Sequence, residues 1–324
     1  MPITALPSST VRLLGSTVNI VSPVDVVKEL IDNAIDAAAK SIEVSISPNT
    51  LDRIQVRDDG HGIASTDFAF LAKVAHTSKL KSFEELHSRG GEMLGFRGQA
   101  LASTNALANV TVITKTASDP VASRVKLRRG IGGVANRFPV SGPIGTTVLI
   151  SDLFDKLPAR KQNLLKHTQK TIDGIKSLIK TYAFARQGKL RFKFKILGNP
   201  DSTWANVPSA DATANGKSRM RDVIMQTFSK NLAKACIYEG FEEPRAQNHI
   251  GIKLTAVLPS LDGDSAAWQG KGAFISVDAR PLSVQYGTTK KIYAMFKTQL
   301  CKALNLERMP PKPFMFLDMD CVPA

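Results

Sequence analysis

The sequence has little of what secreted or membrane-spanning chains need. Its 324 residues include three cysteines and five histidines. No C-x-x-C spacing and no pair of histidines at helical i,i+4 spacing occurs, so neither a disulfide framework nor a zinc site is indicated. No apolar run reaches the roughly 18 residues of a membrane span, and the first residues lack a basic segment followed by an apolar one. These absences predict a cytosolic or nuclear protein with no segment that spans a membrane.

Acidic residues are also few, and the excess of basic over acidic residues is uneven along the chain. Lys and Arg total 43 against 28 Asp and Glu, which gives a net charge of +15. Residues 1–150 carry 16 basic and 13 acidic side chains, whereas residues 151–324 carry 27 and 15. The second half therefore carries +12 of the net charge, and DNA, RNA or an anionic membrane is its expected partner. The alternative is a basic surface that serves only solubility.

Length and hydrophobic periodicity predict two α/β domains. A single core seldom grows past roughly 250 to 300 residues, and apolar residues make up an ordinary 43 % of the chain. Residues 24–39 have the periodicity of an amphipathic helix that Ser22 and Asp25 cap, and two short antiparallel strands follow it. We expect the domain boundary within 200–215, in a loop spanning 199–216. The other expected strands are 109–115, 123–128, 146–151, 250–258 and 272–278, and the other expected helices are 99–107, 160–185, 219–229 and 288–303.

Three polar residues form a stripe on the first amphipathic helix. At 100° per residue, Glu29, Asn33 and Asp36 lie within about 60° of one another, roughly opposite the apolar face. A solvated helix face would explain such a stripe. However, Asn and Asp are poor helix formers for an exposed face, which favours a functional reading.

Glycine clusters mark three further positions. Asp58, Gly60 and Gly62 follow a strand, where an Asp could accept a hydrogen bond from an exocyclic amine and Gly could admit a flat base. The alternative there is an ordinary hairpin turn. Residues 95–101, Gly-Phe-Arg-Gly-Gln-Ala-Leu, precede a helix start, where free N–H groups bind phosphate, although Gly-x-x-Gly also suits a plain turn. Gly145 and Thr146 open a strand.

Taken in order, these segments resemble the ATP-binding motifs shared by DNA gyrase, Hsp90, histidine kinases and MutL. Within that superfamily, the chain is similar to the MutL mismatch-repair family from about residue 8 to its end. Its first residues and first amphipathic helix are most similar to the eukaryotic post-meiotic segregation subunits. The segments that carry the closer resemblance are 77–79 (Thr-Ser-Lys), 95–101, 157–161 (Leu-Pro-Ala-Arg-Lys) and 274–281 (Phe-Ile-Ser-Val-Asp-Ala-Arg-Pro).

The resemblance implies an α+β chain in two domains. Residues 1–205 would form an α/β sandwich of the gyrase, Hsp90 and histidine kinase type (GHKL or Bergerat type) that binds ATP and Mg²⁺. Residues 206–324 would form a ribosomal-protein-S5-like α/β domain that is truncated at its C-terminal end. Glu29 would act as the general base toward the attacking water, and Asn33 would be the Mg²⁺ ligand.

The resemblance also assigns the nucleotide contacts. Asp58 would receive the adenine amine, Gly62 would admit the base, and Thr146 would support the same pocket, with Ala37 beside it. A lid would close over the phosphates, and its residues would be Thr77, Ser78, Lys79, Gly95, Phe96, Arg97 and Gly98.

Three departures from the family pattern bear on activity. Asp59 stands where Asn is usual, and Gln99 stands where Glu is usual, which puts any salt bridge of that Glu in doubt. The lysine that reaches the terminal phosphate from the second domain is expected just past Ala324. Either the protein continues beyond this residue or hydrolysis proceeds without that cation.

The expected function is slow ATP hydrolysis that drives association of the N-terminal arms in DNA mismatch repair. Partners would be a second MutL-family subunit, mismatch-recognition proteins, and DNA held by its backbone through Arg280, Lys290 and Lys291. The resemblance implies a nuclear location. The alternatives are a nucleotide-responsive scaffold with negligible turnover and a related ATPase of the topoisomerase or chaperone type.

Overall fold

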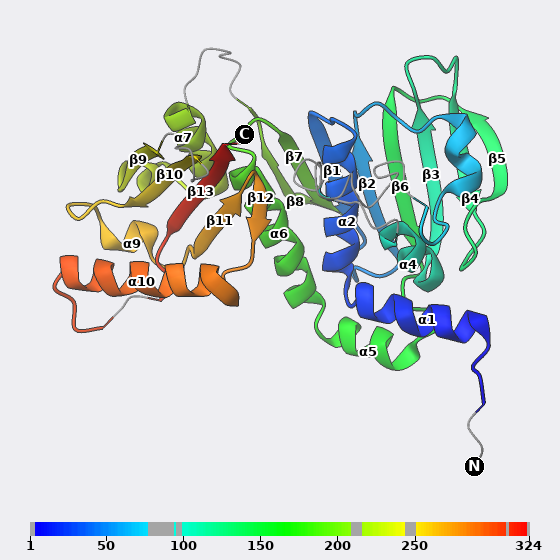
Figure 1. Cartoon of the computed structure of the whole chain (residues 1–324), viewed down its shortest axis with the longest axis horizontal. Coiled ribbons are helices and arrows are strands. Elements are labelled where there is room, and N and C mark those ends of the chain that lie inside the picture. Colours follow the sequence, from blue (N-terminus) through cyan, green and yellow to red (C-terminus); the bar gives the residue numbers. More distant parts are fainter. Residues whose placement is uncertain are drawn as a thin grey trace. The chain divides into compact units, whose positions relative to one another are not determined.

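The computed structural model describes residues 4–76, 94, 99–208, 216–243, 251–308 and 311–322. The chain divides into two compact units (Figure 1). The first comprises Met1–Leu178 and Arg191–Ala205, and the second comprises Ile179–Leu190 and Asn206–Ala324. The α+β class is therefore as predicted, with both units built from helices on a sheet.

The first unit is a sandwich of one eight-stranded sheet and a helical layer. The strand order is β5-β4-β3-β6-β2-β1-β7-β8, and β1 pairs with β7 in parallel while the other registered pairs are antiparallel. The strands are β1 (Ser41–Ile46), β2 (Arg53–Asp58), β3 (Asn109–Lys115), β4 (Ala122–Leu127), β5 (Val134–Val140), β6 (Gly145–Ser151), β7 (Arg191–Ile196) and β8 (Asn199–Asn206). The helices are α1 (Ser8–Asn19), α2 (Pro23–Asp36), the 3₁₀ helix η1 (Ser65–Phe70), α4 (Ala100–Leu107), α5 (Pro158–Lys166) and α6 (Thr168–Ala185), whose last residues belong to the second unit.

Helix α2 packs on the sheet because this contact removes its apolar face from water. Val26, Val27 and Ile31 are fully buried against β1 and β2, and burial of each such side chain contributes roughly 1.5 to 3 kcal/mol. The Asp25 carboxylate accepts hydrogen bonds from the backbone N–H groups of Val21 (3.0 Å) and Ser22 (2.8 Å). This capping box fixes where α2 begins, as the sequence predicts.

The second unit is a five-stranded sheet in the order β12-β11-β13-β10-β9, with β11 and β13 parallel. Its core contains an aromatic cluster in which Phe184 of α6 stacks on Phe274 with ring centroids 4.4 Å apart. The strands are β9 (Cys236–Glu243), β10 (Gly251–Pro259), β11 (Ala273–Val277), β12 (Arg280–Leu282) and β13 (Met315–Val322). The helices are α7 (Gly216–Thr227), α8 (Lys230–Lys234), α9 (Ser265–Trp268) and α10 (Gly287–Ala303).

The structure differs from the sequence prediction in several elements. The expected loop 199–216 contains β8, and the helix expected over 160–185 is broken at His167. The elements that were not predicted are the helices α1, η1, α8 and α9 and the strands β5, β7, β9, β12 and β13. Residues 179–190, which were expected in the first domain, group with the second unit because Phe184 packs in its core. Residues 80–98 lie outside the described residues except at Leu94.

None of the helices in the described part of the chain is both long enough and apolar enough to cross a bilayer.

Candidate functional site

A large cavity opens between the helical layer and the sheet of the first unit. Its volume is about 1340 Å³, above the roughly 300 to 1,000 Å³ of typical small-molecule sites. One wall is α2, and the others come from α1, α4, the segment after β2, and strands β2, β3 and β6. It therefore has room for a ligand with several distinct parts.

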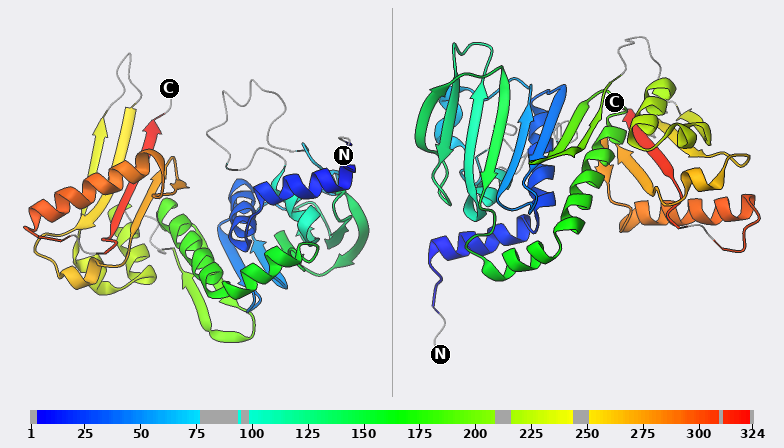
Figure 2. Two further views of the ribbon diagram at one scale, coloured as in Figure 1. Left: turned by 90° about the horizontal axis from the view of Figure 1, so that it is seen from below. Right: turned by 180° about the vertical axis from the view of Figure 1, so that it is seen from behind.

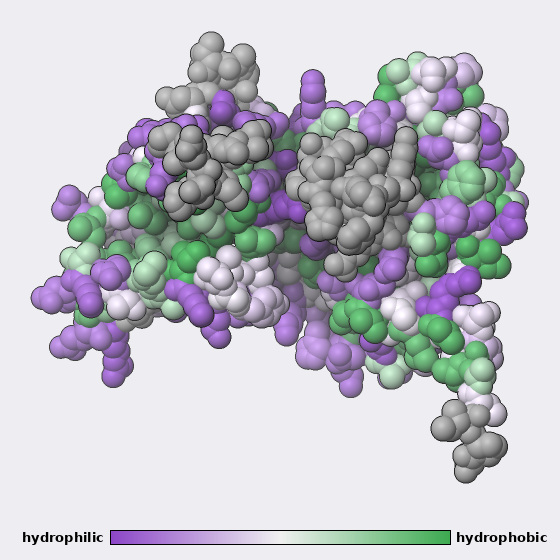
Figure 3. Space-filling model, viewed as in Figure 1, coloured by the Kyte–Doolittle hydropathy of each residue, from purple (hydrophilic) through white to green (hydrophobic). Residues whose placement is uncertain are grey.

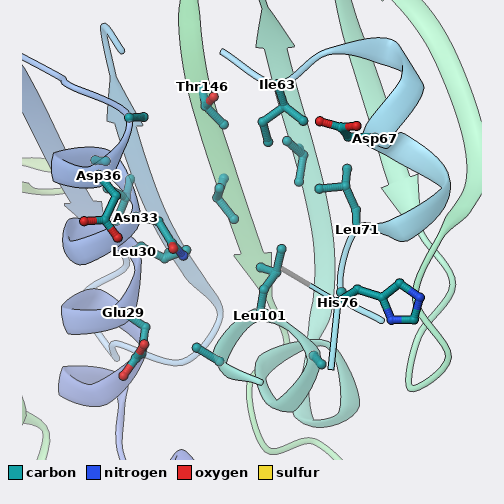
Figure 4. Close-up of a pocket in the computed structure, with 18 of the residues that line it drawn as sticks. Glu29, Leu30, Asn33, Asp36, Ile63, Asp67, Leu71, His76, Leu101 and Thr146 are labelled. Carbon is teal, nitrogen blue, oxygen red and sulfur yellow. The ribbon is translucent and has the colours of Figure 1, made fainter. Parts of the chain in front are cut away.

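The polar stripe of α2 faces this cavity and not open solvent. Glu29, Asn33 and Asp36 lie one above another along the helix (Figure 4), and all three line the cavity. The Glu29 side chain is 33 % exposed, and Lys28 Nζ lies 3.9 Å from its Oε1. Asp36 Oδ1 accepts a hydrogen bond from the Leu94 N–H at 2.9 Å. The stripe thus offers carboxylate and amide oxygens along one side of the cavity.

Asp58 lies at the end of β2 and presents one carboxylate oxygen to the cavity. Its Oδ1 accepts hydrogen bonds from the N–H groups of Gly60 (2.9 Å) and Thr146 (3.2 Å). Among the residues that the structure describes, none donates to Oδ2. Burial raises the pKa of Asp58, and the two N–H donors only partly offset this effect. Asp58 is therefore a fixed acceptor for a ligand group that donates a hydrogen bond.

Glycine is required next to Asp58 because backbone segments meet there. A Cβ on Gly60 would lie 2.6 Å from the Ala37 carbonyl oxygen, and one on Gly62, whose φ is +77°, would lie 2.2 Å from the Lys115 carbonyl oxygen. The His61 N–H donates to the Ala37 carbonyl at 3.0 Å. Gly62 lines the cavity, and the Lys115 backbone at the end of β3 fills the space that its missing side chain leaves. Close packing against β3 is therefore a structural reason for glycine here, beside the predicted approach of a base.

Two threonines connect β3, β6 and the segment after β2 by hydrogen bonds at the Asp58 corner. Thr146 and Thr114 face each other across β6 and β3, with their Oγ1 atoms 3.1 Å apart. Thr114 Oγ1 also donates to the Gly145 carbonyl (3.1 Å) and accepts from the Ile63 N–H (2.9 Å). Thr146 lines the cavity, whereas the fully engaged Thr114 holds its neighbours in place. Sequence reasoning missed Thr114, and its only signal is a polar residue on the buried side of an alternating strand.

The neighbouring Asp59 has a structural task. Its Oδ1 accepts hydrogen bonds from the N–H groups of Lys40 (2.7 Å) and Ser41 (2.8 Å) at the start of β1. An Asn side chain has the same acceptor oxygen. This equivalence explains why the departure at Asp59 leaves the corner intact.

The structure brings together the predicted residues that it describes in the first unit. All six line the same cavity, and they are Glu29, Asn33, Ala37, Asp58, Gly62 and Thr146. Gln99 lines it too. The predicted lid residues lie outside the described residues, and they are Thr77, Ser78, Lys79, Gly95, Phe96, Arg97 and Gly98. Arg280, Lys290 and Lys291 lie in the second unit, on β12 and α10.

Known proteins are similar to this chain in sequence and in fold. Residues 21–130 match the family model of the histidine kinase-, DNA gyrase B-, and HSP90-like ATPases. The human PMS1 protein homolog 1 is 33 % identical over 282 residues, which are 86 % of this chain and 28 % of that protein. The DNA mismatch repair protein MLH1 of Saccharomyces cerevisiae is 34 % identical over 230 residues, 71 % of this chain and 29 % of that protein. The chain thus spans less than a third of the length of these two relatives.

Solved structures show the same fold. The N-terminal domain of a DNA repair protein superposes with a TM-score of 0.75 at 24 % identity and covers 96 % of this chain and 86 % of that one. The Aquifex aeolicus MutL ATPase domain complexed with ADP gives a TM-score of 0.59 at 21 % identity, covering 94 % and 93 %. By its sequence matches, this chain belongs to the MutL family of DNA mismatch repair proteins and contains the family's ATPase domain.

Proposed function

We propose that this protein binds ATP in the cavity of its first unit and hydrolyses it slowly during DNA mismatch repair. The observation that carries the proposal is that Glu29 and Asp58 line one cavity. Glu29 lies eight residues before Ala37, which puts it about 12 Å along the helix axis from the Asp58 corner. That separation leaves room for a ribose and a triphosphate between the base and the site of hydrolysis.

The Asp58 corner fits adenine. The amine of adenine is a donor, and Asp58 Oδ2 is an acceptor with no described partner. Guanine presents a carbonyl oxygen at the same position of its ring, so it would place an acceptor against a carboxylate. The site should therefore prefer ATP to GTP, with Thr146, Gly62 and Ala37 forming the surrounding walls.

The α2 stripe fits the phosphate end and its metal. The amide oxygen of Asn33 is a ligand type that Mg²⁺ accepts, and Mg²⁺ sites combine one or two protein ligands with substrate phosphates. Bound Mg²⁺ would offset the charge on those phosphates. In the described part of the chain, no group of three or more His, Cys, Asp or Glu side chains could hold a metal alone. The proposed lid residues would complete this end.

Glu29 is the proposed general base that takes a proton from the attacking water. We expect Glu29→Ala to lower ATP turnover by about 10² to 10⁴ while leaving ATP binding intact. Because bound ATP and not its hydrolysis favours association, this variant should still associate when ATP is added, as measured by sedimentation velocity. Steady-state turnover and equilibrium binding of ATP give the other two readouts.

Glu43 provides the matched control. It lies on β1, outside the cavity lining, and pairs with Lys195 at 2.5 Å. Glu43→Gln should leave turnover unchanged. Unchanged turnover in Glu29→Ala would remove Glu29 from the role, and a parent protein that binds ATP without measurable turnover would indicate a nucleotide-responsive scaffold.

ATP binding is proposed to drive association with a second MutL-family subunit through α1. This helix lines the cavity at its C-terminal end with Val18 and Asn19, and Asn19 Nδ2 donates to Ser103 Oγ of α4 at 3.1 Å. Its outer side exposes Val11 (54 %) and Leu14 (51 %). An occupant of the cavity would therefore contact the helix that carries an exposed apolar surface, which supports a coupling between the two events.

DNA is the second proposed partner, held by its backbone without base readout. Lys290 and Lys291 are exposed at the start of α10, which follows the strand that carries Arg280. The second unit contains 18 basic and 11 acidic side chains, for a net charge of +7, which supports this assignment. We also propose mismatch-recognition proteins as partners and a nuclear location, for which the support is the eukaryotic relatives of the chain.

A further inference from the structure

The sheet of the second unit is covered by α7 and α8 on one face. Val257 of β10 and Phe316 of β13 are fully buried on that side, with Met220 and Ile224 of α7. Tyr238 of β9 points the same way, because its hydroxyl donates to the Ala233 carbonyl of α8 at 3.5 Å. Residues of β9 and β10 that alternate with these point to the opposite face.

That opposite face is apolar and partly open near the β9 edge. Register pairs Phe241 with Leu254 and Ile237 with Leu258, so the four side chains share the face. Phe241 is 57 % exposed and Ile237 is 43 % exposed, and Ile252 beside them is 38 % exposed. Helix α10 crosses this sheet at a distance from the end of β9 and the start of β10 (Figure 2, left). Apolar side chains gather on the surface of this unit (Figure 3).

β9 is the last strand of the sheet, so the backbone groups on its outer side have no strand partner among the residues that the structure describes. An edge strand of this kind is a template for pairing with another extended chain. Addition of such a chain would supply main-chain hydrogen bonds, and alternate side chains would meet Phe241 and Ile237 on the open face.

The charge of β9 is opposite to that of its surroundings. The strand contains Glu239, Glu242 and Glu243 and no Lys or Arg, in the half of the chain that carries +12. Glu242 pairs with Lys253 on the other face at 3.7 Å. Glu239 and Glu243 are exposed on the open face, where they alternate with Ile237 and Phe241. Because only every second side chain of a strand faces one side of the sheet, a chain that pairs here must carry apolar and basic residues in turn at every second position.

The same two carboxylates select against other occupants. Two copies of β9 paired antiparallel around Phe241 would set Glu239 of each copy opposite Glu243 of the other, and like charges directly opposite are unfavourable. Nucleic acid would be repelled from this edge and drawn to the basic remainder of the unit. Charge complementarity thus leaves a basic polypeptide segment as the occupant.

We propose that the β9 edge of the second unit binds an extended segment of a partner protein in which every second residue is in turn apolar and Lys or Arg. The segment adds a sixth strand beside β9, its apolar side chains cover Phe241 and Ile237, and its cations meet Glu239 and Glu243. This site is separate from the nucleotide cavity and does not depend on ATP.

The probe is a capped, fluorescently labelled peptide of the repeat Val-Thr-Lys-Thr, which places valine and lysine in turn on one face of the strand. We expect saturable binding by fluorescence anisotropy and slower amide hydrogen exchange in residues 237–243. The double variant Glu239→Lys/Glu243→Lys should weaken binding by about tenfold or more, because two cross-strand charge pairs become repulsive. The same peptide with glutamate in place of lysine should not bind the parent protein.

The charge-matched control is Asp201→Lys/Glu307→Lys, at exposed positions on β8 and after α10. It should bind the peptide as the parent does. Equal binding of the acidic peptide, unchanged binding in the β9 variant, or exchange protection elsewhere would overturn the proposal. Self-association of the parent that the β9 variant abolishes would assign the edge to a second copy instead, and a duplex DNA that protects 237–243 would assign it to nucleic acid.

Discussion

At the residue scale, Asp58 determines both the recognition of the base and its pH dependence. The proposed contact needs an ionised carboxylate, because a protonated Oδ2 would point a donor at the adenine amine. Since burial raises the pKa of Asp58, ATP affinity should begin to fall at a higher pH than for an ordinary Asp as the solution is acidified. Titration calorimetry across the acid side of neutrality measures this.

The matched variant is Asp58→Asn, which keeps the Oδ1 acceptor and replaces Oδ2 by a donor. It should weaken ATP binding strongly and remove the pH-dependent part of the affinity. A raised pKa means that the ionised group destabilises the folded state, so the free energy of unfolding should not fall in this variant. Equal affinity of the parent for ATP and GTP would contradict the assignment.

The two adjacent aspartates show which properties of single residues the sequence alone predicts and which it does not. A strand ending in Asp58 and Asp59 predicts an acidic turn, and only a resemblance to known motifs selected Asp58 for the nucleotide. The structure separates them physically, since Asp59 turns back to cap β1. Thr114 was not predicted as a site residue, because a single polar residue within a strand has no distinctive spacing.

At the scale of elements, the β3–β6 pair holds the adenine corner through Thr114. We expect Thr114→Val to lower the free energy of unfolding by about 1 to 3 kcal/mol, because the Ile63 N–H and the Gly145 carbonyl lose a buried partner. It should also weaken ATP binding, although Thr114 does not line the cavity. Urea unfolding and calorimetry measure the two effects.

Thr111 offers a control on the same strand. It points to the less buried side of β3, so Thr111→Val should change neither quantity by much. ATP affinity in Thr114→Val that equals the parent value would show that Thr146 keeps its position without this partner.

Several elements with strong periodicity were predicted, although β7 was missed despite its alternating Phe and Lys residues, and two strands without a regular pattern were also missed. Helix α2 follows from its apolar face and its Asp25 cap, and β1 and β2 follow from alternation. β8 contains Pro200, Asp201 and Ser202, a composition typical of loops. It forms a strand because it is at the edge of the sheet, where Pro is tolerated. β5, also an edge strand, is exposed along most of its length and so lacks an alternating pattern.

At the scale of the whole molecule, the cavity belongs to the first unit, whereas positive charge is shared by both units. The first unit contains 25 basic and 17 acidic side chains, for +8, and the second contains 18 and 11, for +7. A nucleotide is proposed to be bound by specific groups of the first unit. A long polyanion is proposed to be held by the exposed lysines at the start of α10, and the acidic strand β9 would repel it.

Because both units are basic, net charge alone does not select the surface that holds DNA, and the proposed contacts on α10 predict which lysines affect DNA binding. Lys290→Gln/Lys291→Gln should weaken DNA binding equally for all sequences. It should also reduce the slope of log affinity against log salt by about 0.9 for each phosphate contact that is lost. Arg124→Gln/Lys126→Gln removes the same charge from exposed positions on β4 of the first unit and should change the slope little. Filter binding at several salt concentrations distinguishes the two variants. A parent affinity that does not change with salt would rule out backbone contacts as the source of binding, and equal slopes for both variants would show that net charge and not the surface of α10 holds the DNA.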